Sequence, residues 1–519
     1  FIYNDKILKF TGNVNTHAMS DGTGEPHRLS RSLMERCFFY HIRGEISMKE
    51  KNLVSETSGA RAEVHTENKM GTMHMPRLLF TMSIPAICSM LLQAIYNIVD
   101  SIFVSHLSEE AMAAVTLVFP IQMLLVAVGV GTGVGLNSLI SRRLGERKFD
   151  EANSAATHGF LLILVNWAVF FIFGFFCSRP FYTWYAEDNV GLVDMATSYG
   201  TIVICLSGFM FTQVTCEKIL QSTGNMVMPM ISHMIGCIAN IILDPIMIFG
   251  YFGCPAMGVA GAAIATVIGQ FLGMCTVLCF FFLKSHDVKV SFKNFRISGR
   301  MLKDIYVVAL PGMLMQAIPS FVNIVLNQIL IGFSVTAVSV LGVYFRLQSF
   351  VFMPTFGLTQ GAMPIMGYNY GARDRERLMH VTRLTVTTAI IIMICGLLLF
   401  QIFPSQLMSI FDAGDDMMRM GITAMRLLSL CFVPAAIGIT FSTFFQALGH
   451  GIYSLFMTLL RQVIVIMPAA WLLSKTSLGV TGVWLSYPIA EIFGFTFAIF
   501  LFMHLYKKEI KPMPLHHRQ

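Results

Sequence analysis

Two acidic residues lie within long stretches that hold no other charged side chain. Asp100 follows Asn97 by three residues and Asp244 follows Asn240 by four, so in a helix each acid shares a face with an amide. Burial disfavours the charged form of a carboxyl group, so such an acid can take a proton from one side of a membrane and release it to the other. With the amide oxygens it can instead bind Na⁺. The alternative is a structural acid at a membrane boundary, or one bonded to backbone freed near Pro245.

The second half of the chain has charged residues of its own in or beside apolar stretches. They are Arg346, Arg426, Arg461 and Glu491. We expect Arg461 and Glu491 to form an ion pair between helices, and we favour a structural role for these charges. Together with Arg346, the two residues are also candidates for polar sites in the second half. Glu217 and Lys218, by contrast, end an apolar stretch, and we expect them to be solvated.

Other chemistry is disfavoured by the motifs. The sequence holds no CxxC or HExxH pattern, so we predict no metal site beyond Na⁺ at Asp100, Asn240 and Asp244. It also lacks a phosphate-binding loop followed by Lys, so we expect no cofactor and no coupling to ATP. Gly131 and Gly135 are spaced as a GxxxG helix-packing face. With no catalytic constellation, we predict that the chain is not an enzyme.

The composition of the chain indicates that these residues lie in transmembrane helices. Of 519 residues, 55% are hydrophobic and 13% are charged, whereas a soluble protein carries about 25% charged residues. Uncharged runs recur at the length of about 20 residues that a spanning helix needs. We predict an all-α polytopic membrane protein with twelve transmembrane helices. The net charge of +7 lies in short loops, which disfavours nucleic acid as a partner.

Lys and Arg concentrate in alternate loops. They lie after the second predicted helix (Arg142, Arg143, Arg147, Lys148), in the central loop (Lys284 to Lys303), after the eighth helix (Arg373, Arg375, Arg377) and in the C-terminal tail (Lys507, Lys508, Lys511). The loops between them are poorer in basic residues. Short cytoplasmic loops carry an excess of Lys and Arg, so we predict that both termini are cytoplasmic.

The two halves of the chain repeat each other. Segments that begin at Gly135 and Gly361, or at Gln221 and Gln446, have similar sequences and lie 226 and 225 residues apart. Each half holds six predicted spans, so both repeats insert with the same topology. We therefore expect two six-helix lobes related by a parallel pseudo-two-fold axis along the membrane normal, with a cavity between them.

The repeat and the composition together divide the chain. We predict an N-lobe of helices 1–6 over 76–284 and a C-lobe of helices 7–12 over 304–507. A basic cytoplasmic linker over 285–303 joins them, and 508–519 forms a cytoplasmic tail. Residues 1–75 are polar and without periodicity, so we expect a disordered cytoplasmic tail or translated upstream sequence that is absent from the mature protein.

Several motifs resemble the multidrug and toxic compound extrusion family, MATE, over about residues 77 to 507. They are Ser83–Pro85 (SIP), Tyr96–Asp100 (YNIVD), Asn240–Pro245 (NIILDP), Gly258–Thr266 (GVAGAAIAT) and Gly367–Ala372 (GYNYGA). The resemblance implies that Asp100, Asn240, Asp244, Ala262 and Thr266 line a cation site in the N-lobe, and that Pro85 bends the first helix. No acid occurs in Gln316–Ser320 of helix 7, which favours bacterial branches such as the DinF type over the NorM type.

The resemblance also implies a function. We expect a bacterial cytoplasmic (inner) membrane protein, monomeric, that exports cationic amphipathic compounds in exchange for H⁺ or Na⁺. The alternative is a flippase for a lipid-linked saccharide or polysaccharide of the wider superfamily. A flippase cavity that handles pyrophosphate should be rich in Arg and Lys, whereas acids dominate the first half of this chain.

Overall fold

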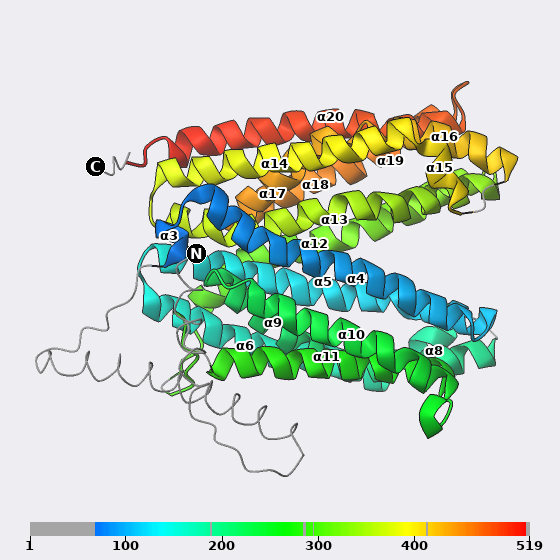
Figure 1. Ribbon diagram of the computed structural model, residues 1–519, viewed down its shortest axis with the longest axis horizontal. Coiled ribbons are helices and arrows are strands. Elements are labelled where there is room, and N and C mark those ends of the chain that lie inside the picture. The colour runs from blue at the N-terminus through cyan, green and yellow to red at the C-terminus, as the bar shows by residue number, and fades with distance from the viewer. Residues whose placement is uncertain (1–67, 187–188, 284–286, 294, 412–413, 515–519) are drawn as a thin grey trace, which may run out of the picture. The chain divides into compact units, whose positions relative to one another are not determined.

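The computed structural model describes residues 68–186, 189–283, 287–293, 295–411 and 414–514, and within them the chain is helical with no strand. Figure 1 shows the helices side by side, those of the first half next to those of the second. Most of the predicted tail, residues 1–67, lies outside the described residues. The predicted tail, residues 1–75, extends too far, because Lys69–Thr72 forms the short helix α3. The side chain of Asn68 caps this helix by accepting from the Met70 N–H.

In the described part of the first half there are six candidate spans when the bent pair α8 and α9 is counted as one. Its elements are α4 (Met75–Ser105), α5 (Glu109–Gly145), α6 (Phe149–Ile172) continued by η1 (Phe173–Cys177) and α7 (Ser178–Ala186), α8 (Val190–Cys205), α9 (Gly208–Ser222), α10 (Val227–Phe249), η2 (Tyr251–Gly253) and α11 (Gly258–Leu283). The side chains of Leu164 and Val169 on α6 are 58% and 61% exposed. Apolar side chains as exposed as these are typical of a helix that faces lipid.

The described residues of the second half likewise give six candidate spans when the bent pair α16 and α17 is counted as one. Its elements are α12 (Gly299–Ile331), α13 (Val335–Gly371), α14 (Arg375–Ile402), α15 (Pro404–Ser409), α16 (Asp415–Ser429), α17 (Phe432–Ala447), α18 (Gly451–Leu459) continued by η3 (Leu460–Ile466) and α19 (Met467–Ser474), α20 (Val480–Leu505) and η4 (Tyr506–Ile510). Helix α12 begins five residues before the predicted C-lobe boundary, because Ser298 Oγ accepts from the Met301 N–H and caps it.

Ten helices of the described residues are long and apolar enough to cross a membrane, and there are twelve spans if each of two bent helix pairs is one span. The pairs are α8 with α9, bent by 42°, and α16 with α17, bent by 47°. They occupy the fourth span of the first half and the fourth span of the second. The prediction of twelve helices in two six-helix halves is confirmed in this form.

The repeat extends to backbone details. Ser108 and Ser334 both cap a 37-residue helix, α5 and α13 respectively, by accepting from the N–H three residues on. Arg147 and Arg373, just beyond the ends of these helices, have φ of 59° and 54°. Such left-handed backbone is uncommon outside glycine, so its recurrence at matching positions shows that both halves use the same local fold.

Pairs of glycines hold the two halves together. A Cβ built on Gly131 of α5 would lie 2.5 Å from Met313 Cγ of α12, and one built on Gly357 of α13 would lie 2.6 Å from Ile87 Cα of α4. One turn further, Gly135 faces α12 and Gly361 faces α4 in the same way. Each half therefore offers the same small-residue face to the other, and the packing role predicted for Gly131 and Gly135 is confirmed.

The helices α5 and α13 cross at their C-terminal ends. A Cβ on Gly145 would overlap the carbonyl oxygen of Tyr368, and a Cβ on Gly371 would overlap that of Arg142. We call this end of the bundle the basic end, because it is where the loops after α5 and α13 hold their Arg and Lys residues. The two halves are in direct backbone contact here, so the basic end is closed.

Candidate functional site

Asp100 and Asp244 meet inside the N-lobe. Asp100 comes from α4 and Asp244 from α10, two helices that pack against each other (Figure 1). The two carboxyl groups lie within hydrogen-bonding reach of each other. Asp244 is 0% exposed, while Asp100 is half-buried. The pair therefore has one member in the protein interior and one at its edge.

Asn240 and Thr266 complete the site on the α10 side. In the amide orientation that satisfies both ends of the Asn240 side chain, Nδ2 donates to Asp244 Oδ2 at 2.9 Å. Its Oδ1 accepts from the Thr266 N–H at 3.1 Å and from Thr266 Oγ1 at 3.3 Å. Asn240 thus fixes the orientation of the Asp244 carboxyl and is itself fixed by α11.

Close helix packing explains why α10 and α11 bring these groups together. A Cβ on Gly269 of α11 would lie 2.7 Å from the carbonyl oxygen of Gly236 on α10 and 3.2 Å from Asn240 Cβ. Ala262, which is 1% exposed, is four residues before Thr266 and lies on the same face of α11. Small residues on this face allow the backbones to approach closely enough for Asn240 to reach Thr266.

Three polar residues at this site were missed by the sequence reasoning. The Tyr96 hydroxyl of α4 lies close to the Thr266 side chain. Tyr199 of α8 lies within electrostatic range of Asp100, and its hydroxyl accepts from Gln122 Nε2 at 3.1 Å. The spacing of Tyr96, four residues before Asp100, was the available signal. Nothing in the sequence marked Tyr199 or Gln122.

Two other predicted residues of the first helix lie apart from this centre. The Asn97 side chain is exposed, and its Oδ1 accepts from Gln93 Nε2 at 3.2 Å. Pro85 is buried within α4, and the helix continues past it although proline has no N–H to donate. Ser89 Oγ donates to the Pro85 carbonyl oxygen at 3.1 Å. Bending at Pro85 stays a prediction.

The predicted C-lobe pair forms. Arg461 Nη1 donates to Glu491 Oε1 at 2.7 Å, with the Glu491 side chain 10% exposed and that of Arg461 23% exposed. The Arg461 charge is therefore largely neutralised by its partner. Arg346 on α13 and Arg426 on α16 are exposed and lie apart from that pair.

The expectation for Glu217 and Lys218 is wrong. Both are buried on α9, at 9% and 6% exposure. Gln213 Nε2 donates to Glu217 Oε1 at 3.0 Å, and Lys218 Nζ donates to Gln221 Oε1 at 3.0 Å. The two residues follow an apolar stretch in sequence, but α9 is covered by α5, α6 and α11, so they lie inside the N-lobe rather than in water.

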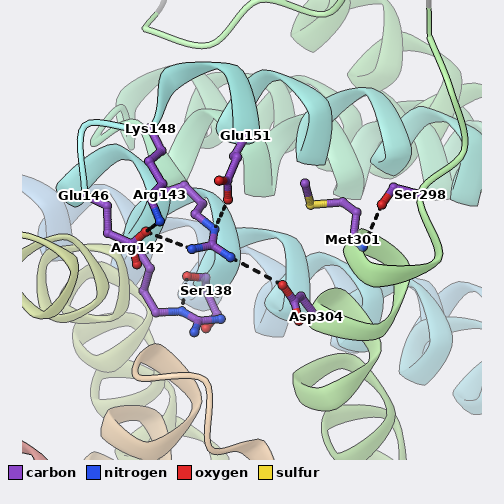
Figure 2. Close-up of polar contacts among 9 residues, drawn as sticks. All are labelled: Ser138, Arg142, Arg143, Glu146, Lys148, Glu151, Ser298, Met301 and Asp304. Carbon is purple, nitrogen blue, oxygen red and sulfur yellow. Dashed lines mark hydrogen bonds and ion pairs between the residues drawn. The ribbon is translucent and has the colours of Figure 1, made fainter.

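A cluster of charged groups joins the halves at the basic end. Figure 2 shows Arg143 of α5 pointing toward Glu146, Glu151 of α6 and Asp304 of α12, at 2.8, 2.9 and 3.4 Å. Partial burial of Glu146 is outweighed by the hydrogen bonds from Lys148 and Arg143, which hold the pKa of this carboxyl below its usual range. Within this cluster, the contact of Arg143 with Asp304 joins the first half to the second.

The chemistry available at the Asp100–Asp244 pair is cation binding. Its polar atoms are carboxyl, amide, hydroxyl and phenol groups, which can hold a proton or coordinate a hard cation such as Na⁺ through oxygen. Within the described residues no group of three or more His, Cys, Asp or Glu side chains is arranged to hold a metal ion.

Comparison with known proteins places this chain among transporters. A family model described as MatE matches residues 85–246 and 311–472, one segment in each half. The multidrug export protein MepA of Staphylococcus saprophyticus is 26% identical over 411 residues, which cover 79% of this chain and 89% of that protein. MepA of Staphylococcus aureus strain MW2 is 26% identical over 430 residues, with the same coverage.

Solved structures agree in fold. A multidrug resistance MATE family transporter of the MOP superfamily in an outward-facing conformation has a TM-score of 0.80 and 27% identity, and the match covers 85% of this chain and 99% of that chain. A MOP superfamily transporter from Pyrococcus furiosus, described as having a binding pocket of reversed polarity that suggests a different function, has a TM-score of 0.78 and 27% identity over the same shares.

Proposed function

This chain belongs to the MatE family, whose two matches together span more than half of it, and from that premise we propose that it is a secondary active antiporter. It is a multi-pass membrane efflux transporter of the MATE type. In our proposal it exports cationic amphipathic compounds, and the energy comes from H⁺ or Na⁺ that enters and binds at Asp100 and Asp244. The basic end faces the cytoplasm of a bacterial cell, because short cytoplasmic loops are enriched in Lys and Arg.

The proposal rests on one observation: the carboxyl groups of Asp100 on α4 and Asp244 on α10 face each other. Two carboxylates that lie this close repel each other, so the pair favours the uptake of a proton or another small cation. Ionised charges within a membrane are costly, by roughly 2.5–3.5 kcal/mol for Asp at a helix centre. A bound cation offsets that cost, so the conformational state of the pair depends on whether H⁺ or Na⁺ is present.

Of the two ions, H⁺ is the one we propose first. The paired carboxyls accept a proton directly, whereas Na⁺ has to separate them and coordinate their oxygens together with Thr266 Oγ1. Asn240 Oδ1 is already used by the Thr266 backbone N–H. If Na⁺ is the coupling ion, its binding would break the hydrogen bond between Asn240 and Asp244. The ion would then bind at the same site.

Transport follows from alternation between two arrangements of the halves. With the basic end closed, H⁺ reaches the acid pair from the outer side, and the exported compound leaves in that direction. The halves then rock so that the basic end opens, H⁺ is released to the cytoplasm, and a new compound binds between them. A ligand can shift this equilibrium only by its differential affinity for the two arrangements.

The test is efflux of ethidium from proteoliposomes that contain the purified chain. We expect Asp100→Asn to abolish gradient-driven efflux, because the amide cannot bind a proton. Asp194→Asn is the matched control, since Asp194 lies on α8 with its side chain 58% exposed and paired with Arg179. Imposing a pH gradient or a Na⁺ gradient separately identifies the coupling ion.

The outcomes separate the proposal from its rival. Efflux by wild type and Asp194→Asn, but not by Asp100→Asn, supports cation-coupled antiport. Equal efflux by Asp100→Asn and wild type would remove the acid pair from the mechanism. If neither gradient drives ethidium, transfer of a fluorescent lipid-linked saccharide across the bilayer should be measured. Of the three arginines that could bind its pyrophosphate, Arg461 is already paired with Glu491.

A further inference from the structure

A short segment ahead of the first spanning helix contacts both halves of the chain. Residues 68–73 contain α3 and lie just before α4 in the sequence. We call this segment the strap. Figure 1 shows α3 at the same end of the bundle as the start of α14, which is the basic end. The antiport mechanism above gives the strap no role, although it lies where the halves have to separate.

On the side of the first half, the strap is held through its first residue. Asn68 Nδ2 donates to the Thr223 carbonyl oxygen at 3.1 Å and to Asp287 Oδ2 at 2.5 Å. Thr223 caps the end of α9, and Asp287 lies in the linker after α11. A Cβ built on Gly224 would lie 3.1 Å from Lys69 Cε, so the turn after α9 also packs closely on the strap.

On the side of the second half, the backbone of the strap is bound by α13 and α14. The last carbonyl groups of a helix have no partner within it. Arg377 Nη2 donates to the carbonyl oxygens of Met70 and Met73 at 3.1 and 2.8 Å. Asn369 Nδ2 donates to the Met70 carbonyl oxygen at 3.3 Å, and Asn369 Oδ1 accepts from Arg377 Nε at 3.2 Å. One guanidinium group therefore binds two carbonyls of the strap and is itself oriented by Asn369.

The strap also packs between the halves. Met70 is 0% exposed and belongs to one buried apolar cluster with Met226 of the first half and with residues of α13. A Cβ built on Gly71 would lie 3.1 Å from Tyr368 Cε1, and the carbonyl oxygen of Tyr368 is the atom that leaves no room at Gly145 of α5. The strap thus packs on the same residue of α13 that closes the crossing of α5 and α13.

We propose that the strap holds the basic end closed, and that Arg377 is the residue whose bonds to the strap break when this end opens. The proposal rests on the alternation of the two halves in the proposed antiport. Only two residues separate α3 from α4, so the strap moves with the first half and keeps its contacts at Thr223 and Asp287. Opening then separates Arg377 from the carbonyl groups of Met70 and Met73, and water takes their place.

The size of the effect follows from the loss of hydrogen bonds to a charged group. Such bonds favour the state that contains them by about 10- to 150-fold. Arg377→Met removes them from the closed arrangement and takes nothing from the open one, so the ratio of open to closed molecules should rise by that factor. Arg377→Lys keeps the charge, but an ammonium group does not reproduce the planar fork of the guanidinium. Its effect should therefore have the same direction and be smaller.

The first test is the rate at which a water-soluble maleimide reacts with a cysteine between the halves. Ser141→Cys, in the full-length chain without its native cysteines, places a thiol on α5 where the serine is 0% exposed and faces Gly367 of α13. When opening and closing are fast relative to the reaction, its rate is proportional to the open population. We expect the rate to rise about 10- to 150-fold in Arg377→Met.

Arg383→Met is the matched control, because Arg383 is an exposed arginine six residues further along α14. Its maleimide rate should equal that of wild type. Arg377→Lys keeps the test informative if Arg377→Met does not fold. Wild-type rates in both Arg377 variants would overturn the proposal. A lower unfolding temperature in Arg377→Met without any change in the maleimide rate would assign Arg377 a structural role alone.

The second test shows which half keeps the strap. Spin labels at Thr72 and His380 report the distance from the strap to α14, and labels at Thr72 and Asp150 report its distance to α6. All three side chains are exposed. In Arg377→Met we expect the first distance to lengthen in part of the molecules and the second to stay as in wild type. A longer distance from Thr72 to Asp150 would show that the strap leaves the first half instead, which contradicts the role given to Arg377.

These outcomes are independent of the efflux test, because neither measurement needs ethidium or an ion gradient. A raised maleimide rate in a chain that exports no ethidium would support the strap and count against the proposed antiport. Wild-type maleimide rates in the Arg377 variants of a chain that does export ethidium would refute the strap and leave the antiport intact. Failure of the strap and failure of the proposed function therefore give different results.

Discussion

Closure of the basic end depends on glycines that leave no room for a methyl group. The perturbation is Gly135→Ala on α5, or its counterpart Gly361→Ala on α13. A Cβ at Gly135 would lie 2.6 Å from the Ile305 carbonyl oxygen, and one at Gly361 would lie 2.7 Å from Ser83 Cα. Ordinary contact begins at 3.4 Å. Because the atoms that are met belong to the backbone, the helices have to separate by about 0.7–0.8 Å to relieve the overlap.

The magnitude follows from the cost of overpacking, about 1–3 kcal/mol. The alanine also gains about 0.8–1.0 kcal/mol of helix propensity over glycine, but α5 and α13 stay helical whether the halves are together or apart, so this gain cancels. We therefore expect the ratio of closed to open molecules to fall by about 5- to 150-fold in either variant.

The assay is a distance measurement between spin labels at Lys148 and Glu376, two exposed positions beyond the ends of α5 and α13, in a background without native cysteines. Gly342→Ala is the control, because a Cβ on Gly342 of α13 meets nothing within 4 Å. The distance distribution should move to longer values in Gly135→Ala and Gly361→Ala. If both variants match Gly342→Ala, the glycine contacts do not hold the basic end closed.

Two further predictions concern stability. Arg461→Met should lower the free energy of unfolding by about 3–5 kcal/mol, and with it the thermal unfolding temperature, because it leaves Glu491 buried without its partner. The double variant with Glu491→Gln should recover much of this loss. No recovery would contradict the pairing argument. Burial lowers the pKa of His450 despite its contact with Glu509, and a group whose folded pKa is depressed contributes stability that is lost as the pH falls through that value. The unfolding temperature of wild type should therefore drop below about pH 6.5 more steeply than that of His450→Gln, and parallel curves for the two would refute the assignment.

Much of the fold could be predicted because membrane burial and the repeat leave strong patterns in the sequence. A spanning helix must be apolar along its whole length, so uncharged runs located the spans. The bends between α8 and α9, and between α16 and α17, were not predicted, since each break of two residues lies within a continuous apolar run. The start of α12 at Gly299 was also missed, because the Ser298 cap lies inside a basic segment that was assigned to the linker.

At the candidate site, the sequence marked the residues that we propose to hold a cation. Asp100, Asn240 and Asp244 are polar groups in apolar helices, and helical periodicity puts Asn240 and Asp244 on one face. Only the tertiary structure decided which of these faces meet. Asp100 reaches Asp244, whereas Asn97 on the same helix points to Gln93.

The same distinction explains Glu217, whose neighbours in sequence suggested solvent and whose neighbours in space are α10 and α11. A helical period of 3.6 residues defines the faces of one helix but carries no information about its rotation against other helices. That rotation is set by close contacts such as Gly269 with Gly236 and Gly135 with Ile305. The sequence therefore determined the candidate groups and the spans, and packing between helices decided which acids lie close together and which acid is buried away from that pair.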